Sequence, residues 1–227
     1  RSRGLGDVYK RQILDISNNT LLTSLICAGN QLTSLDVSQN TALTYLDCNT
    51  NQLNSLDVSQ NTALTHLEFA SNQLTSIDLS GCSDLEYLFC PNNQLTSLDV
   101  SQNTYLGDLW CHDNPITSLD LSQNPIFSLN CGGNQLTCLN FKNGNNTNLI
   151  QFFYARENPN LTCIEVDNPT WAEQNWSNDV DPGVTFSLDC NYPNDCFGSS
   201  EPCQTTYSTD TQTACDSYTW IDGNTYT

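Results

Sequence analysis

Methionine and basic residues are what this sequence lacks most clearly. None of the 227 residues is Met, and six are Lys or Arg against 25 Asp and Glu, which gives a net charge of −19. Four of the six basic residues lie in the first twelve positions, so from Ile13 onward 24 acidic residues stand against two basic ones and the net charge is −22. Such a polyanion repels nucleic acid and anionic membranes and favours cations or basic partners, so no nucleic-acid ligand is expected.

Long apolar runs and catalytic motifs are also missing. No stretch reaches the roughly 20 apolar residues that a membrane helix requires, so no membrane insertion is expected. The two histidines, His66 and His112, lie in no triad-like or metal-ligand motif, and neither a nucleophile elbow nor a phosphate-binding loop occurs. We therefore expect a protein that is not an enzyme and that uses no cofactor.

What the sequence has in abundance is repetition. Each unit reads L-x-x-L-x-C-x-x-N-x-L-x-x-L-D-V-S-x-N, and a self-similarity of this kind indicates a solenoid, in which stacked units bury the apolar face that one unit cannot bury alone. The first five units are spaced by 21 residues and the next two by 20 and 23, as judged from the residue before each expected strand: Leu22, Leu43, Leu64, Leu85, Leu106, Ile126 and Leu149.

Each unit shows two segments with a period of two. Residues 24–28 alternate with Leu25 and Cys27 pointing inward, which indicates a strand, and Leu35 and Val37 indicate a second extended segment on the opposite wall. Parallel strands of neighbouring units would lie about 4.8 Å apart. An inward column of amides should satisfy backbone groups of the coils; its members are Asn30, Asn51, Asn72, Asn93, Asn114 and Asn134.

The repeated unit resembles the leucine-rich repeat family. Leu22, Leu25, Cys27, Asn30 and Leu32 match its L-x-x-L-x-L-x-x-N-x-L core, with Cys where the family usually has Leu. The resemblance covers residues 13–167. It implies a mainly β leucine-rich-repeat solenoid with 21-residue coils, parallel strands and few or no long helices, in a protein that is secreted or attached to the cell surface.

Residues 168–190 are expected to close the solenoid as a C-terminal cap. Asn168 followed by Pro169 predicts a short helix through Trp176, and Trp171 and Trp176 can cover the exposed core. The segment resembles the closing segment of secreted leucine-rich repeat proteins from the Bacteroidetes. That resemblance implies a disulfide-linked cap.

Twelve cysteines need an account. The cap resemblance implies a bond between Cys163 and Cys190, although Cys138 has the same repeat position as Cys163 and competes for it; Cys196 and Cys203 are candidates for a local pair. Five others share one inward column with Phe69 and Tyr154: Cys27, Cys48, Cys90, Cys111 and Cys131. Because Phe replaces Cys at this position in one unit, the column favours buried, unreactive thiols over a metal site. Cysteine usage favours an oxidising, extracellular compartment.

Both ends of the sequence indicate a fragment. Residues 1–12 differ from the rest in charge and pattern and resemble a translated sequencing-adapter remnant, with a basic tail as the alternative. The repeats then begin in mid-unit, without an N-terminal cap. Residues 191–207 have the composition of a linker. Residues 208–227 resemble the start of a small β-rich module that is repeated in flavobacterial cell-surface proteins.

The outward positions of the first strand vary from unit to unit, whereas the scaffold positions barely change. Because a solenoid's strand face is usually its concave binding face, and because exposed aromatic residues favour contact with protein or sugar, we expect a monomeric module that recognises a protein or glycan there. The alternative is a structural spacer of a larger adhesin-like surface protein, whose aromatic pairs only stabilise the sheet. The candidate binding residues are Tyr45, Asp47, His66, Glu68, Tyr87, Phe89, Asp108, Trp110, His112 and Phe153.

The opposite wall carries one aspartate per unit. Like charges directly opposite each other destabilise a sheet, so we expect neighbouring hydroxyl groups and backbone amides to satisfy these carboxylates. A weak calcium ladder is the alternative, although calcium prefers six to eight oxygen ligands and one Asp per coil supplies few. The column contains Asp36, Asp57, Asp78, Asp99 and Asp120.

Overall fold

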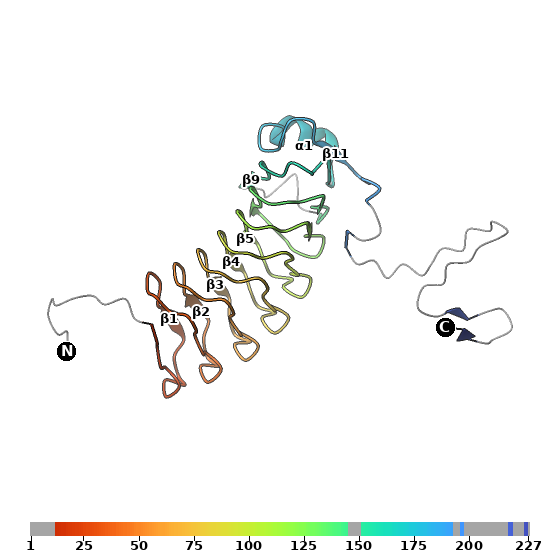
Figure 1. The fold of residues 1–227 in the computed structure, drawn as a ribbon. Helices are drawn as coiled ribbons and strands as arrows, with labels where there is room; N and C mark the ends of the chain where they lie inside the picture. Colours follow the sequence, from red (N-terminus) through yellow and green to blue (C-terminus); the bar gives the residue numbers. More distant parts are fainter. Residues whose placement is uncertain (1–11, 145–150, 193–195, 198–217, 220–224, 227) are drawn as a thin grey trace. The chain divides into compact units, whose positions relative to one another are not determined.

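The computed structural model describes residues 12–144, 151–192, 196–197, 218–219 and 225–226. Successive coils stack in sequence order along one axis, from β1 at one end to α1 at the other (Figure 1). The chain divides into two compact units, Arg1–Phe197 and Gly198–Thr227. The expectations for the first eleven residues and for most of the linker lie outside the described residues.

A parallel sheet of seven strands forms one wall of the solenoid, as the alternating pattern predicts. The register places equivalent repeat positions side by side, for example Leu25, Leu46 and Leu67. In sheet order the strands are β1 (Ser24–Ile26), β2 (Tyr45–Asp47), β3 (His66–Glu68), β4 (Tyr87–Phe89), β5 (Asp108–Trp110), β7 (Ser128–Asn130) and β9 (Phe152–Tyr154).

The opposite wall pairs regularly only toward the C-terminus. In the early coils its ladder is reduced to an isolated parallel bridge between Asp36 and Asp57. The later coils form a second parallel sheet, in the order β11-β10-β8-β6. Its strands are β6 (Ser118–Asp120), β8 (Cys138–Asn140), β10 (Cys163–Glu165) and β11 (Thr185–Ser187).

The core between the walls is a stack of leucines and cysteines. Cys48, Cys90, Cys111 and Cys131 are fully buried and Cys27 is nearly so, which confirms the inward column. Burial raises the pKa of Cys27 to about 11 and that of Cys111 to about 12, because a thiolate would lose its hydration there. These thiols are therefore protonated at neutral pH and are poor nucleophiles.

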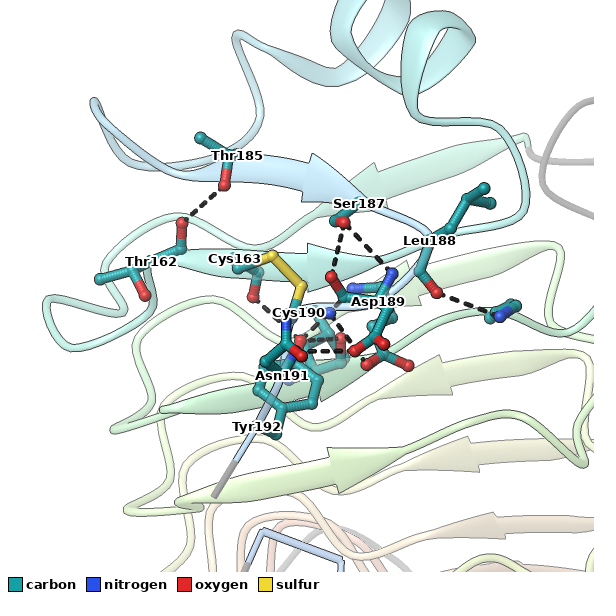
Figure 2. The surroundings of a disulfide bond; sticks show 12 residues. Thr162, Cys163, Thr185, Ser187, Leu188, Asp189, Cys190, Asn191 and Tyr192 are labelled. Atoms are coloured by element: carbon teal, nitrogen blue, oxygen red, sulfur yellow. Dashed lines mark hydrogen bonds between the residues drawn. A yellow bond between two sulfur atoms is a disulfide. The ribbon is translucent and has the colours of Figure 1, made fainter. Parts of the chain in front are cut away.

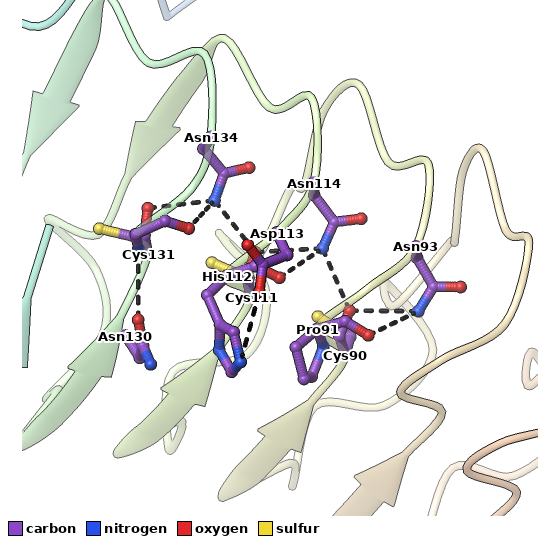
Figure 3. A network of polar contacts seen from close by, with 11 residues as sticks. Cys90, Pro91, Asn93, Cys111, His112, Asp113, Asn114, Asn130, Cys131 and Asn134 are labelled. Carbon is purple, nitrogen blue, oxygen red and sulfur yellow. Dashed lines mark hydrogen bonds and ion pairs between the residues drawn. The ribbon is translucent and has the colours of Figure 1, made fainter. Parts of the chain in front are cut away.

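The predicted inward column of asparagines is confirmed. Asn93 Nδ2 donates to the carbonyl oxygens of Phe69 (3.1 Å) and Cys90 (3.2 Å), and its Oδ1 accepts from the backbone N–H of Leu74 (3.1 Å). Figure 3 shows the same arrangement in successive coils, where Asn114 donates to Cys90 O in turn. From Asn51 onward each amide therefore joins its own coil to the preceding one, and Asn158 extends the column into the last coil.

A second column of asparagines on the other side of the core was not anticipated. Asn61 Nδ2 donates to the carbonyl oxygens of Val37 (3.1 Å) and Asn40 (2.9 Å) of the preceding coil. Asn40, Asn103 and Asn124 are buried in the same role. In one coil Cys82 replaces the asparagine, with Sγ 3.7 Å from Val58 O. The final letter of the L-D-V-S-x-N half-repeat is the signal that could have revealed this column.

The cap helix forms as predicted. Helix α1 (Pro169–Trp176) begins after Asn168, whose side-chain oxygen accepts from the backbone N–H of Trp171 at 3.1 Å. Trp176 is 4% exposed and stacks on Phe153 with ring centroids 4.4 Å apart. This eight-residue helix is too short to cross a bilayer, and no other described helix could do so.

Two disulfides hold the segment that follows the helix. Cys163 bonds to Cys190, as the resemblance implied (Figure 2). Cys138 bonds to Cys196, so the expected local pair of Cys196 with Cys203 is wrong. Between the two bonds, the Tyr192 hydroxyl donates to Leu139 O at 2.7 Å and accepts from the backbone N–H of Glu165 at 3.3 Å. Tyr192 thereby joins β8 to β10.

The register expected for the last strand of the first sheet is wrong by one residue. Phe153 pairs with Leu129 and is 4% exposed, so it belongs to the core and not to the candidate binding face. Phe152, 39% exposed, takes the outward position, and Tyr154 does not join the inward column. The reason is a longer coil: 24 residues separate the paired positions Leu129 and Phe153, and a shift of one residue exchanges the two faces of a strand.

The second unit has one described element pair. β12 (Tyr218–Thr219) and β13 (Thr225–Tyr226) are antiparallel, with Tyr218 opposite Tyr226. The assignment of residues 208–227 to a β-rich module stays a prediction.

Candidate functional site

The candidate site is the outer surface of the seven-stranded sheet, here called the strand face. In β2, β3, β4 and β5 the middle residue is fully buried, and the first and third residues are partly exposed. Hydrogen bonds to both neighbouring strands hold these positions in place. The sheet is therefore a rigid support for whatever side chains the repeats place there.

Seven rings form a continuous group on the strand face, here called the aromatic stripe. Six of them were predicted from the sequence, and the seventh is Phe152, which pairs with Ser128. Trp110 stacks on Phe152 with ring centroids 5.2 Å apart and planes 5° apart. Neighbouring centroids elsewhere lie 5.7 to 6.4 Å apart. The stripe comprises Tyr45, His66, Tyr87, Phe89, Trp110, His112 and Phe152.

Carboxylates beside the stripe fix the orientation of its polar edges. Glu68 accepts from the Tyr45 hydroxyl at Oε1 and from Asn49 Nδ2 at Oε2, both at 2.8 Å. Trp110 Nε1 donates to Asp108 Oδ1 at 2.7 Å. The hydrogen bond to Glu68 raises the pKa of Tyr45 to about 12, because it favours the protonated phenol. Of the predicted rim residues, Glu68 and Asp108 thus hold rings of the stripe, and Asp47 accepts from the backbone N–H of Asn49.

The histidines of the stripe make different contacts. His66 Nδ1 lies 2.9 Å from the Thr65 hydroxyl. His112 is edge-on to Trp110, and its Nε2 lies 4.0 Å from Asp113 Oδ2. Burial lowers the pKa of His112, so its ring is neutral at pH 7. Within the part of the chain that the structure describes, no group of three or more His, Cys, Asp or Glu side chains could hold a metal ion.

The aspartates of the opposite wall are satisfied locally. Asp57 Oδ1 accepts from the backbone N–H of Ser59 at 2.9 Å, and the other members of the column make the equivalent bond to the serine two residues on. This bonding is the arrangement that the sequence favoured. The weak calcium ladder stays a prediction.

Acid should remove part of the stability that these bonds provide. Hydrogen bonds from the following serine lower the pKa of Asp36, Asp57 and Asp78. A lowered folded-state pKa stabilises the fold above the unfolded value of about 3.9, and that stabilisation is lost as the pH falls further. Thermal unfolding followed from pH 5 to pH 2.5 should show a falling Tm. The triple variant Asp36→Asn, Asp57→Asn, Asp78→Asn keeps the side-chain oxygens that accept these bonds, but the side chains cannot titrate. Its Tm should therefore fall less steeply with pH than the Tm of the wild type. Equal falls of Tm in the two proteins would contradict the assignment.

A small cavity also lies on the opposite wall. Its volume is about 50 Å³, and Asp78, Asp99 and Asn103 are among its lining residues. That volume has room for a water molecule or two and not for an organic ligand. The strand face, which is a surface rather than a pocket, therefore remains the candidate site.

Comparison with known proteins identifies relatives of the repeats. Residues 62–103 match the family described as leucine rich repeats (2 copies). The functional domain of InlJ from Listeria monocytogenes, which is described as including a cysteine ladder, is 42% identical with a TM-score of 0.60, over 69% of this chain and 37% of that chain. No curated protein matches the sequence significantly.

Two further Listeria monocytogenes structures share the fold. The internalin InlF is 26% identical with a TM-score of 0.53, over 68% of this chain and 45% of that one. Internalin C2 is 18% identical with a TM-score of 0.56, over 75% of this chain and 84% of that one. At this identity the similarity concerns the fold alone. The chain thus spans less than half the length of InlJ and InlF.

Proposed function

We infer, from the premise that this chain is a leucine-rich repeat protein with an internalin-like fold, that it is an extracellular or cell-surface recognition module. Its strand face binds a protein or glycan ligand, and the chain itself performs no catalysis. The module acts as a monomer, with the ligand seated across several coils.

The aromatic stripe is the observation that carries this proposal. The hydrophobic core is complete on the inner side of the sheet, so the fold does not need seven rings on its outer side. Rigid, partly exposed aromatic side chains lose little entropy on binding and dominate the energetics of protein interfaces. The two disulfides support the extracellular assignment, because such bonds persist in oxidising compartments.

A structural spacer is the second candidate. The specific observation in its favour is that the rings stack on one another across neighbouring strands, for example His66 on Tyr87 at 5.7 Å. Cross-strand aromatic pairs of this kind stabilise a sheet even without a ligand.

The Trp110→Ala variant of the full chain separates the two candidates. A glycan array and a pull-down from an extracellular-matrix extract would first supply a purified ligand. The variant should keep its Tm and lose affinity about 30-fold, or about 2 kcal/mol, because Trp110 is at the centre of the stripe. Tyr105→Ala is the control, since Tyr105 is 66% exposed and lies outside the stripe. Unchanged affinity in Trp110→Ala would favour the spacer or the opposite wall.

A further inference from the structure

We propose that the aromatic stripe takes a cationic protein segment, whose Arg or Lys side chains lie over the rings and beside the carboxylates of the strand face. This inference rests on the proposed function and narrows it to one class of ligand. Three observations carry it: the charge of the coils, the hydrogen bonds of the stripe, and the positions of the carboxylates.

The coils that bear six of the seven rings of the stripe carry no compensating positive charge. No Lys or Arg occurs between Arg11 and Lys142, a stretch that contains β1 to β8. Lys142 and Arg156 lie beyond it and bond to backbone oxygens, of Leu188 at 3.0 Å and Asn178 at 3.4 Å. A surface of one sign steers partners of the opposite sign and rejects those of like sign.

Several donors on the strand face are already used within the protein. Trp110 Nε1 donates to Asp108, and the Tyr45 hydroxyl and Asn49 Nδ2 both donate to Glu68. Around these three side chains the strand face therefore offers a ligand chiefly aromatic faces and carboxylate oxygens, which are acceptors. A guanidinium or ammonium group has donors only, and it is attracted to aromatic faces. A sugar hydroxyl also needs donors from the protein, and these side chains direct theirs to the protein's own carboxylates.

The carboxylates lie next to the rings and next to each other. Asp47 is in register with Glu68 across β2 and β3, and Asp108 is in register with Tyr87 across β4 and β5. Burial, with a smaller effect from Glu68, raises the pKa of Asp47. A cation placed between Asp47 and Glu68 would offset their mutual repulsion. Each positive side chain of a bound segment could thus contact one ring and one carboxylate.

The test uses a hexa-arginine peptide as the probe, because the natural ligand is not identified. Its affinity for the full chain would be measured by microscale thermophoresis in 20 mM and 300 mM NaCl. The peptide should bind the wild type, and more weakly at high salt. A hexa-glutamate peptide of the same length should not bind.

Two variants with the same charge change distinguish the strand face from overall charge. In Asp47→Asn/Asp108→Asn the side-chain oxygens still accept from Asn49 N and Trp110 Nε1. In Asp57→Asn/Asp120→Asn they still accept from Ser59 N and Ser122 N on the opposite wall. We expect the first variant to lose at least tenfold in affinity for the peptide and the second less than twofold. Equal losses would overturn the inference, because the peptide would then respond only to net charge.

Trp110→Ala and a neutral glycan array separate failure of this inference from failure of the proposed function. Loss of peptide affinity in Trp110→Ala supports both. If the peptide does not bind but a neutral glycan does, and Trp110→Ala abolishes that binding, the recognition function stands and the cationic partner is overturned. If peptide binding is unaffected by Trp110→Ala, the stripe is not the peptide's site and the cationic partner is overturned, while the recognition function is judged by the ligand from the glycan array or the pull-down.

Discussion

Asn93→Ala should lower the free energy of unfolding by about 3–5 kcal/mol, because one buried amide serves two coils. The substitution leaves the backbone N–H of Leu74 without the acceptor that it has at 3.1 Å. It also removes one of the two asparagine donors from each of Phe69 O and Cys90 O. A buried donor without a partner costs about 1–3 kcal/mol, and the weakened carbonyl bonds and the void add to that.

The neighbouring Gln94→Ala is the matched control, since Gln94 is exposed and joins the adjacent coil through its backbone. It should change stability by less than about 0.5 kcal/mol in urea unfolding. Asn93→Asp provides a sharper check. One carboxylate oxygen could still accept from Leu74 N, but the other would approach two carbonyl oxygens, so Asp should destabilise more than Ala at pH 7 and less at pH 4. A small effect from all three substitutions would contradict the proposed role of the column.

The periodicity of the sequence was sufficient to predict the stacking of the coils. In residues 24–28 the inward and outward positions alternate, and the inward residues recur after 21 residues, so neighbouring coils must present matching faces to each other. The inward direction of Asn93 followed from the same pattern, since a polar residue repeated inside an apolar stack needs backbone partners. The cap helix could also be predicted from a local signal, because Asn168 followed by Pro169 is by itself a signal for the start of a helix.

Features that depend on distant parts of the chain could not be predicted in this way. The bond between Cys138 and Cys196 joins residues 58 positions apart, and no repeat position relates them. The outward position of Phe152 depends on the length of one irregular coil, where a single residue changes the parity of the strand. In both cases the regular repeat pattern does not hold, so one unit no longer predicts the structure of the next.

The candidate site was predictable in position but not in detail. Strand alternation placed Tyr45, Glu68 and Trp110 on one face, and the structure brings them together there. Sequence alone could not show that Glu68 accepts from Tyr45, or that Asp108 accepts from the indole, because these contacts depend on side-chain rotamers. They matter because they decide which hydrogen-bonding groups remain available to a ligand.

Trp176→Ala should destabilise the C-terminal coils by about 3–5 kcal/mol, the range measured when a large buried aromatic residue is truncated. Trp176 closes the end of the core: it stacks on Phe153 at 4.4 Å and lies within 5.7 Å of Phe141 and 6.2 Å of Phe186. Trp171→Ala is the control, since Trp171 is only partly buried and meets Trp176 edge-on at 5.1 Å. It should cost less than half as much.

Because each coil contacts chiefly its neighbours, the loss caused by Trp176→Ala should be local. Hydrogen exchange should therefore accelerate most at the backbone amides of β9 and β10, which lie beneath the cap, and least at those of β2 and β3. The disulfide between Cys163 and Cys190 still holds β11 beside β10 in the variant, so β9 should respond more than β10. Equal acceleration of exchange in all coils would mean that the solenoid unfolds as one cooperative unit. The cap would then stabilise the strand face that carries the aromatic stripe as strongly as it stabilises the C-terminal coils.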